Sequence, residues 1–396
     1  MNVFLLVHGL PVGGTEVMVT HLARELQREG IGVGIGCLDE IGDLGEELRS
    51  EGFHLDLFSR KPGLDVALPR RIARRLKEGR FDVLHAHQYT CYFYGVFAKV
   101  LAGVPLVFTE HGRFYPDLPS TKRRLFNFLF SRMADRITAV SKGVKESLHG
   151  IEGFRAESIE VLYNGIDVER FPPMSPQAKR EARARLGHRL PGPLIGTIGR
   201  LDPIKNQGLL IAALALLSPK VPGLALAIVG DGPERERLGA LADGLGVADR
   251  VYFLGKRTDI VEVLSAFDVF ALSSFSEGTP MTILEAMAAS LPIVSTAVGG
   301  IPEVLTDGVH AFLVEGIPPR LDDPRALLTG EYTRRYASSL ERAILEPSES
   351  AARARGARER VERKFSLEAI TLRYRALYDT VARSTRTRAP VPARRQ

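Results

Sequence analysis

The sequence contains no tryptophan and only two cysteines, Cys37 and Cys91, among its 396 residues. Both cysteines lie in apolar surroundings, so the chain is not a disulfide scaffold and a reducing compartment is favoured. No run of about 18 apolar residues occurs, so we expect no membrane-spanning helix. The opening stretch, 1–9, has no basic residues before its short apolar run, so we expect no signal peptide. These absences predict a cytoplasmic protein.

What is present is typical of a globular protein, with 45% hydrophobic and 25% charged residues. The net charge of +6 is unevenly distributed, because residues 60–145 hold 17 Lys/Arg and 6 Asp/Glu. Such a patch fits an anionic membrane surface or an acidic ligand. No nucleic-acid-binding motif accompanies it, so we expect no nucleic-acid partner. The patch predicts peripheral binding to the inner face of the plasma membrane.

Short apolar runs alternate with helical segments along most of the chain, which predicts an α/β fold with mostly parallel sheets. In the first half these runs lie at 3–7, 31–37, 53–58, 82–86, 105–109, 136–140 and 158–162. The Pro-rich stretch 171–176 is typical of a linker. We therefore expect a first domain at 1–175 and a second at 190–364. A closing helix at 365–382 and a disordered basic tail at 383–396 follow.

Ligands of parallel sheets bind at the carboxyl ends of the strands, and the stretch 273–304 follows such a strand. Thr279 occupies an N-cap position and Pro280 the first position of a helix expected to reach Ser290. The free N–H groups of Met281 and Thr282 then form an anion site at the positive end of the helix. Glu277, beside Gly278, and Glu285 flank this site. Two acids beside an anion site are explained if each binds sugar hydroxyls, Glu285 on a ribose and Glu277 on a second sugar.

The E-x7-E pattern from Glu277 to Glu285, with the Gly299-Gly300-Ile301-Pro302-Glu303 turn, resembles the donor site of family 4 retaining glycosyltransferases. This resemblance implies the GT-B fold, in which two Rossmann-like domains face a cleft. It also implies transfer of a sugar from a nucleotide-diphosphate sugar, with a UDP-sugar expected first, without a metal cofactor. The stretches 61–69, 108–113 and 164–167 are similar to transferases of bacterial exopolysaccharide and envelope glycan assembly. A glycan or lipid-linked acceptor is the corresponding expectation.

Other positions gain roles from the same resemblance. Arg200 and Lys205 flank a loop after the strand at 194–198, and Arg can fork onto phosphate oxygens while Lys supplies a point charge. They match the pyrophosphate-binding pair of the family, and His111 matches its histidine near the transferred sugar. The expected catalytic groups are therefore Glu277, His111, Arg200 and Lys205. Further donor contacts are expected from Gly13, Gly14, Gly230 and Lys256.

Several alternatives remain open. Arg200 and Lys205 can instead pair with Asp202, and His85 and His87 share one face of a strand, as metal ligands do, although no third ligand is apparent. The stretch 122–133 predicts a basic helix that either binds lipid or buries Phe128 and Leu129. An epimerase, a phosphorylase or a non-enzymatic sugar-nucleotide-binding protein would share the fold. Residues 318–332 depart from the family as an insertion without an assigned role.

Overall fold

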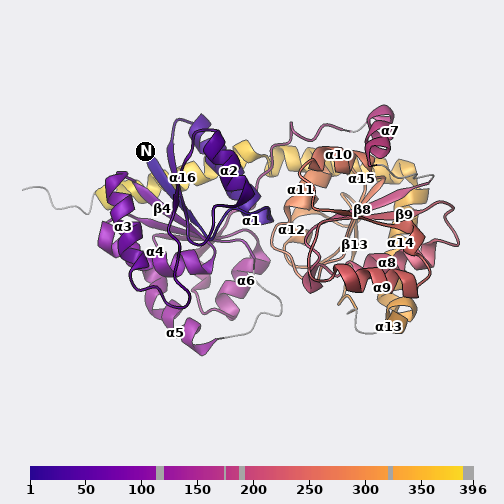
Figure 1. The fold of residues 1–396 in the computed structure, drawn as a ribbon, viewed down its shortest axis with the longest axis horizontal. Helices are drawn as coiled ribbons and strands as arrows, with labels where there is room; N and C mark the ends of the chain where they lie inside the picture. Colours follow the sequence, from indigo (N-terminus) through magenta and orange to yellow (C-terminus); the bar gives the residue numbers. More distant parts are fainter. Residues whose placement is uncertain (113–119, 174, 187–191, 320–323, 387–396) are drawn as a thin grey trace, which may run out of the picture. The chain divides into compact units, whose positions relative to one another are not determined.

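The computed structural model describes residues 1–112, 120–173, 175–186, 192–319 and 324–386. These residues form two compact units, one of residues 1–166 with the chain from 367 onward, and one of residues 167–366. Each unit contains one parallel sheet with helices on it (Figure 1). The predicted α/β fold of two Rossmann-like domains is confirmed.

The sheet of the first unit has the order β3-β2-β1-β4-β5-β6-β7, with every pair parallel. Its strands are built from the apolar runs of the first half, since residues buried on both faces read as continuous hydrophobic segments. They are β1 (Asn2–Val7), β2 (Gly32–Cys37), β3 (His54–Leu57), β4 (Val83–His87), β5 (Leu106–Glu110), β6 (Arg136–Ala139) and β7 (Ile159–Val161).

The helices of the first unit form two groups. The core on one face of the sheet includes side chains of α3 (Leu68–Glu78), α4 (Tyr89–Ala102) and α6 (Lys142–Gly150), with α5 (Thr121–Phe130) packed on its margin. Elsewhere α1 (Gly14–Arg28) packs against α2 (Gly42–Ser50) and against α16 (Leu367–Arg386), which also contacts β4. Residues 383–386 of the predicted disordered tail continue α16, and residues 387–396 lie outside the described residues.

The sheet of the second unit has the order β10-β9-β8-β11-β12-β13 and is again parallel. Its strands are β8 (Leu194–Ile198), β9 (Ala225–Val229), β10 (Val251–Gly255), β11 (Val269–Leu272), β12 (Ile293–Thr296) and β13 (Phe312–Val314). One core joins this sheet to α8 (Gly208–Leu217), α9 (Arg235–Gly244) and α14 (Glu331–Leu345). The remaining helices are α7 (Pro176–Arg185), α10 (Ile260–Ala266), α11 (Met281–Ala288), α12 (Ile301–Val304), α13 (Pro324–Thr329) and α15 (Pro347–Lys364).

Part of the predicted insertion is structured. Residues 324–329 form α13, which packs on α8, and Asn206 Nδ2 donates a hydrogen bond to Pro319 O at 3.2 Å. Residues 320–323 of the insertion lie outside the described part of the chain. The described part of the insertion is therefore attached to the sheet of the second unit. Within the described residues, no helix is long and apolar enough to cross a bilayer.

Candidate active site

The predicted donor-site residues of the second unit lie at the carboxyl edge of its sheet, where parallel strands bring their following loops together. Arg200 follows β8, and Glu277 lies in the loop after β11. Hydrogen bonds join these loops, because Phe275 N donates to Ile204 O at 2.8 Å and Leu201 N donates to Asp231 O at 2.9 Å. The fold thus brings residues that are about 75 positions apart in sequence into one loop cluster.

Lys205 and Glu277 form an ion pair in this cluster, with 2.7 Å between Lys205 Nζ and Glu277 Oε1. Ser274 Oγ donates to the same carboxylate oxygen at 2.6 Å. The Glu277 side chain is 8% exposed, so its charge is largely screened from water by these two partners. Lys205 therefore has an acidic partner, but that partner is Glu277 and not Asp202.

Arg200 is held differently. Its guanidinium is 62% exposed and pairs with Asp202 across 2.8 Å, so the salt bridge considered as the alternative is present in this structure. The backbone of Arg200 is fixed, since Gln207 Nε2 donates to its carbonyl oxygen at 3.0 Å. Exposed ion pairs are worth only about 0–1 kcal/mol. An anionic ligand can therefore take the Arg200 side chain from Asp202 at small cost.

The helix that follows Glu277 begins at Met281, the first residue of the predicted range 281–290, but its cap lies one residue later than predicted. Pro280 is the N-cap with an extended ψ of 124°, α11 starts at Met281, and it ends at Ala288 and not at Ser290. The expected Thr279 cap was wrong because the chain turns into the helix only after the proline. The hydrogen bonds of the helix begin with Ile283 N donating to Pro280 O at 3.1 Å. The N–H groups of Met281 and Thr282 precede that bond and point out of the helix start.

Glu285 lies one turn into α11 and is buried. Burial raises the pKa of Glu285 to about 7, and the positive charge of Arg170 opposes this shift. A carboxyl group in a low-dielectric site keeps its proton unless donors arrive to stabilise the carboxylate. Two hydroxyl groups of a bound diol are donors of that kind.

The paired glycines after β12 support Glu277. A Cβ on Gly299, whose φ is +53°, would lie 1.9 Å from the carbonyl oxygen of Glu277, and Gly300 N donates to that oxygen at 3.1 Å. A side chain at position 299 would push away the backbone that carries the predicted catalytic acid. The backbone of the glycine turn thus lies directly against the backbone of Glu277.

Gly230 has a similar structural role, since a Cβ there would lie 2.0 Å from the carbonyl oxygen of Gly199. Gly230 N donates to Gly255 O at 2.8 Å, which joins the loops after β9 and β10. Lys256 follows Gly255 at the same edge and is exposed. Gly278 lies between Glu277 and the buried Thr279.

In the first unit, Gly13 and Gly14 form the start of α1. Gly13 is the N-cap in extended conformation, and its carbonyl oxygen accepts the first helical bond from Val17 N at 2.9 Å. Leu10 N donates to Ile41 O at 3.1 Å, so the glycine loop is attached to the loop after β2. The glycine pair therefore lies at the carboxyl edge of this sheet, next to β1.

His111 follows β5 at this edge and is 9% exposed. Its Nε2 lies 2.8 Å from Nδ1 of His87, which ends β4 and is fully buried. Burial lowers the pKa of His111 to about 3, so the imidazole is neutral at physiological pH. The sequence signal for this contact is the His85-Ala86-His87 pattern, which by itself suggests only a pair of metal ligands. Arg113, the last residue of the stretch 108–113, lies outside the described residues.

The metal alternative does not fit the arrangement of the histidines. His85 Nδ1 lies 2.7 Å from the Tyr378 hydroxyl, and His85 Nε2 lies 2.7 Å from Thr109 Oγ1. Both ring nitrogens are therefore occupied by hydrogen bonds. The described part of the chain contains no group of three or more His, Cys, Asp or Glu side chains placed to hold a metal ion.

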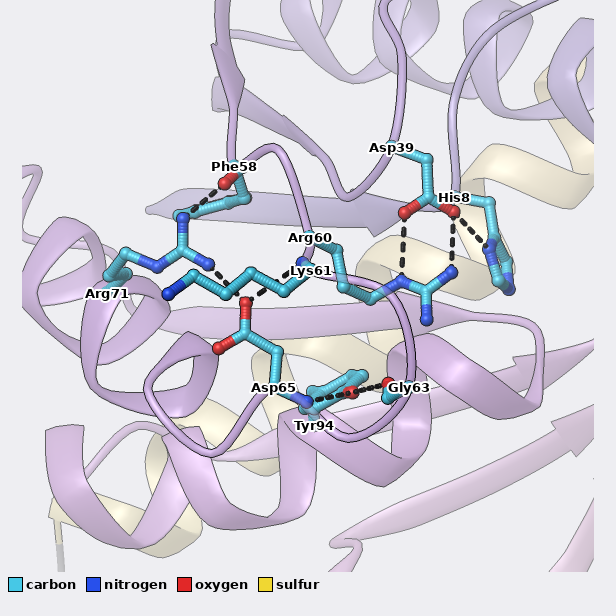
Figure 2. Close-up of polar contacts among 9 residues, drawn as sticks. All are labelled: His8, Asp39, Phe58, Arg60, Lys61, Gly63, Asp65, Arg71 and Tyr94. Carbon is cyan, nitrogen blue, oxygen red and sulfur yellow. Dashed lines mark hydrogen bonds and ion pairs between the residues drawn. The ribbon is translucent and has the colours of Figure 1, made fainter.

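A second polar cluster of the first unit was not predicted as a site. Asp39, after β2, accepts hydrogen bonds from Arg60 Nε at 2.8 Å and Nη2 at 3.0 Å, and His8 Nδ1 lies 3.3 Å from the same carboxylate (Figure 2). Nearby, Asp65 is buried and accepts from Lys61 N at 3.2 Å. The amine of Lys61 extends toward Arg71 and is exposed. Hydrogen bonds and ion pairs thus hold the loop at 59–67 in place, and the loop exposes the Lys61 side chain.

Two family models match the chain. The model described as Glycosyltransferase Family 4 matches residues 12–170, and the model described as Glycosyl transferases group 1 matches residues 178–318. Their border falls close to the division between the two compact units.

Curated relatives and solved structures give a consistent result. A D-inositol 3-phosphate glycosyltransferase of Actinosynnema mirum is 30% identical over 77% of this chain and 80% of its own length. A protein of the same name from Mycobacterium marinum is 32% identical, but the match spans only 53% of that relative and 60% of this chain. Anabaena Alr3699/HepE, solved in complex with UDP-glucose, has a TM-score of 0.81 and 25% identity, covering 96% of this chain and all of that one. With both halves matched by these models, the chain belongs to the family 4 glycosyltransferases of the GT-B fold.

Proposed function

We propose that this chain transfers a sugar from a nucleotide-diphosphate sugar to an acceptor hydroxyl with retention of anomeric configuration. A UDP-sugar is our first choice of donor, because the Anabaena neighbour was solved with UDP-glucose. The observation that carries the proposal is the 2.7 Å pair of Lys205 and Glu277, in which Glu277 lies three residues before Pro280, the N-cap of α11. A sugar diphosphate requires cations and N–H donors for its phosphates and carboxylates for its hydroxyls. This one edge supplies both kinds of group.

The diphosphate would be held by Lys205, Arg200 and the N–H groups of Met281 and Thr282. These groups face the charge that develops on the leaving nucleoside diphosphate, and preorganised donors stabilise such charge strongly. Lys205 can exchange Glu277 for a phosphate oxygen. Glu277 would keep its bond from Ser274 and gain capacity to accept hydrogen bonds from the donor sugar. In our proposal this set carries the phosphate charge in place of a metal ion.

Glu285 would bind the ribose diol through both carboxylate oxygens. Its raised pKa of about 7 means that Glu285 is partly protonated near pH 7 when no donor is bound. Two ribose hydroxyls that donate to both oxygens stabilise the carboxylate over the acid, so binding would shift Glu285 toward its ionised form. Ribose binding is thus coupled to the ionisation of a single buried side chain.

His111 would serve the transferred sugar as a hydrogen-bonding group. As a neutral imidazole it has one N–H donor and one acceptor nitrogen. Same-face attack and a covalent intermediate are both compatible with these residues, and we propose retention without choosing between them.

For the acceptor we propose a lipid-linked or glycan substrate of bacterial exopolysaccharide or envelope glycan assembly, reached at the inner face of the plasma membrane. The first unit has an exposed surface suited to this location. On α5, Phe128 and Leu129 are 62% and 58% exposed, whereas Phe126 and Phe130 stack on each other and contact the aromatic side chains of α4. The alternative that Phe128 and Leu129 belong to the core is therefore wrong.

Exposed basic side chains lie on the same helix as this apolar surface and on α3 of the same unit. Lys122 and Arg124 on α5 are exposed, and so are Arg70, Arg74 and Lys77 on α3. Arg123 differs, because its guanidinium pairs with the buried Glu152 at 3.2 Å and has a structural role. Apolar side chains among exposed cations favour an anionic lipid surface.

A phosphate-bearing polyol is a second candidate acceptor, after the printed names of the Actinosynnema and Mycobacterium relatives. The observation in its favour is the exposed Lys61 on the braced 59–67 loop, at the carboxyl edge of the first sheet (Figure 2). Transfer to D-inositol 3-phosphate, lost in Lys61→Ala, would select this acceptor over a lipid-linked one.

The two acids of the donor site can be separated kinetically. In Glu277→Gln we expect kcat for UDP release from UDP-glucose to fall about 100-fold with little change in KM, because a charge-stabilising group is lost in the transition state. In Glu285→Gln we expect donor affinity to fall about tenfold, because one charged hydrogen-bond acceptor is lost. Glu359→Gln, on the exposed face of α15, is the control. Unchanged kinetics in both site variants would remove the proposed donor site.

Donor binding should depend on pH through Glu285. The carboxylate is the form that accepts the ribose hydroxyls, so affinity for UDP-glucose should be constant above the pKa of about 7 and fall as the pH decreases below it. We expect the dissociation constant, measured by calorimetry, to rise roughly tenfold when the pH is lowered from about 8 to about 6. Proton release should appear as a dependence of the binding heat on the buffer. Glu285→Gln should lose both effects, and equal affinity of the parent protein at the two pH values would contradict the role of Glu285.

Membrane binding should depend on both charge and apolar contact. The double change Lys122→Glu and Arg124→Glu should weaken co-sedimentation with phosphatidylglycerol vesicles more than tenfold, since each basic residue near such a surface contributes about 1 kcal/mol. Phe128→Ser with Leu129→Ser should weaken binding at unchanged charge. Charge reversal at Arg334 and Arg355, exposed on the second unit, is the control. Binding that survives both changes on α5 would disprove the docking surface.

A further inference from the structure

The first unit contains a buried row of hydrogen bonds whose direction can be assigned. Thr138 Oγ1 donates to the carbonyl oxygen of Phe108 at 3.4 Å, and a carbonyl oxygen can only accept. Thr109 must then donate to Thr138 across their 2.5 Å contact, which leaves Thr109 Oγ1 as the acceptor for His85 Nε2–H at 2.7 Å. His85 Nδ1 is consequently a lone pair that accepts from the Tyr378 hydroxyl at 2.7 Å. This direction gives every hydrogen of the row an acceptor.

The row fixes the ring that packs on His87. The centroids of the His85 and His87 rings are 3.9 Å apart. The rings of Tyr374 and Tyr378, on α16, also pack on His85, with centroid distances of 5.4 and 5.6 Å. Because His85 is bonded at both nitrogens, it cannot rotate without breaking the row. His87 is therefore held with its Nδ1 directed at His111.

The contact between His87 and His111 joins two neutral imidazoles. Both rings are buried, and burial holds the pKa of each well below its usual range. One nitrogen of the 2.8 Å pair must carry the hydrogen and the other must accept it. Either His87 donates and His111 keeps its proton on Nδ1, or His111 donates and His87 keeps its proton on Nε2.

The surroundings favour the first arrangement. Within the described residues, His87 Nε2 and His111 Nδ1 have no hydrogen-bond partner that meets normal geometry. A buried N–H without an acceptor is less favourable than a lone pair without a donor. The side chain of Asn164 lies beside His111 and favours a proton on it. A proton on His111 Nδ1 thus has an acceptor nearby, whereas a proton on His87 Nε2 has none.

We propose that His87 is a positioning residue that donates its Nδ1–H to His111 Nε2 and so fixes His111 in the Nδ1–H tautomer. The Nδ1–H of His111 would then turn from Asn164 to a hydroxyl or ring oxygen of the transferred sugar when the donor binds. Without His87, the two tautomers of a neutral imidazole differ little in free energy, and His111 would present a donor only part of the time. The tautomer assignment stands on the geometry, while its consequence for turnover rests on the proposed function of His111.

The tautomer is measurable without any ligand. In protein labelled with 15N-histidine, the two-bond nitrogen–proton correlation pattern distinguishes Nδ1–H from Nε2–H for each of the nine rings. We expect His111 to show the Nδ1–H pattern in the parent protein and an averaged pattern in His87→Phe. His54→Gln, at an exposed site of the same unit, should leave His111 unchanged. An Nε2–H pattern for His111 in the parent protein would overturn the assignment, even if His87→Phe did not fold.

The kinetic consequence is tested with UDP-glucose and the release of UDP. His87→Phe should lower kcat about three- to tenfold, as expected for the partial loss of one hydrogen bond, with KM for UDP-glucose within about twofold of the parent value. His87→Asn, whose side-chain amide can also donate to His111, should recover part of the loss. A changed tautomer with unchanged kcat would show that His111 does not contact the sugar in the reaction. Absence of turnover in the parent protein would count against the proposed function and leave the tautomer result standing.

Discussion

The donor site depends on how the backbone and side chain of Glu277 are held. Its carboxylate binds Lys205 and Ser274, and its carbonyl oxygen accepts from Gly300 N. Gly299 has to be a glycine because any Cβ would collide with that carbonyl. Three loops at the carboxyl edge, those after β8, β11 and β12, therefore meet at one residue. The positions of the cation, of the helix start and of the second acid all follow from that convergence.

The ion pair between Lys205 and Glu277 also explains how a site for an anion can carry two acids. A buried carboxylate without a partner would cost several kcal/mol, and the lysine removes that cost while no diphosphate is bound. In the proposed donor complex the lysine would turn to phosphate, and sugar hydroxyls would replace it on Glu277. Glu285 avoids the same cost by a different route, since burial keeps its proton in place. The charge of Glu277 is thus balanced by an ion pair, and that of Glu285 is reduced by partial protonation near pH 7.

The first unit uses burial in another way. Its three clustered histidines are kept neutral by desolvation, and their hydrogen bonds run back through threonines to the sheet and through Tyr378 to α16. A neutral imidazole has one donor and one acceptor, so its orientation and tautomer determine which nitrogen can donate a hydrogen bond and which can accept one. Rigid support from strands and from α16 is therefore required for His111 to act as a defined hydrogen-bonding group.

Much of the fold could be predicted, because apolar runs such as those at 3–7 and 194–198 are buried on both faces of parallel strands and punctuated by turn residues. The loop with Glu277 and the helix with Glu285 that follows it could be located for the same reason. The N-cap of α11 was misassigned by one residue, since capping depends on backbone angles that local sequence does not determine. The partner of Lys205, the contact of Gly299 with Glu277, and the pairing of His87 with His111 join residues far apart in the chain. The exposure of Phe128 and Leu129 depends on which face of α5 meets α4. The local pattern of a single sequence does not determine any of these long-range contacts.

The most direct test of the account is a thermal-shift screen of the purified protein against UDP-, GDP- and ADP-sugars in the presence of a chelator. A ligand that binds only the folded chain stabilises it by mass action, by about 2.7 kcal/mol at one hundred times its dissociation constant. We predict a higher melting temperature with UDP-sugars, and loss of that shift when Lys205 is replaced by alanine. A well-folded sample whose melting temperature no nucleotide sugar changes would contradict the donor site at Lys205, Glu277 and Glu285.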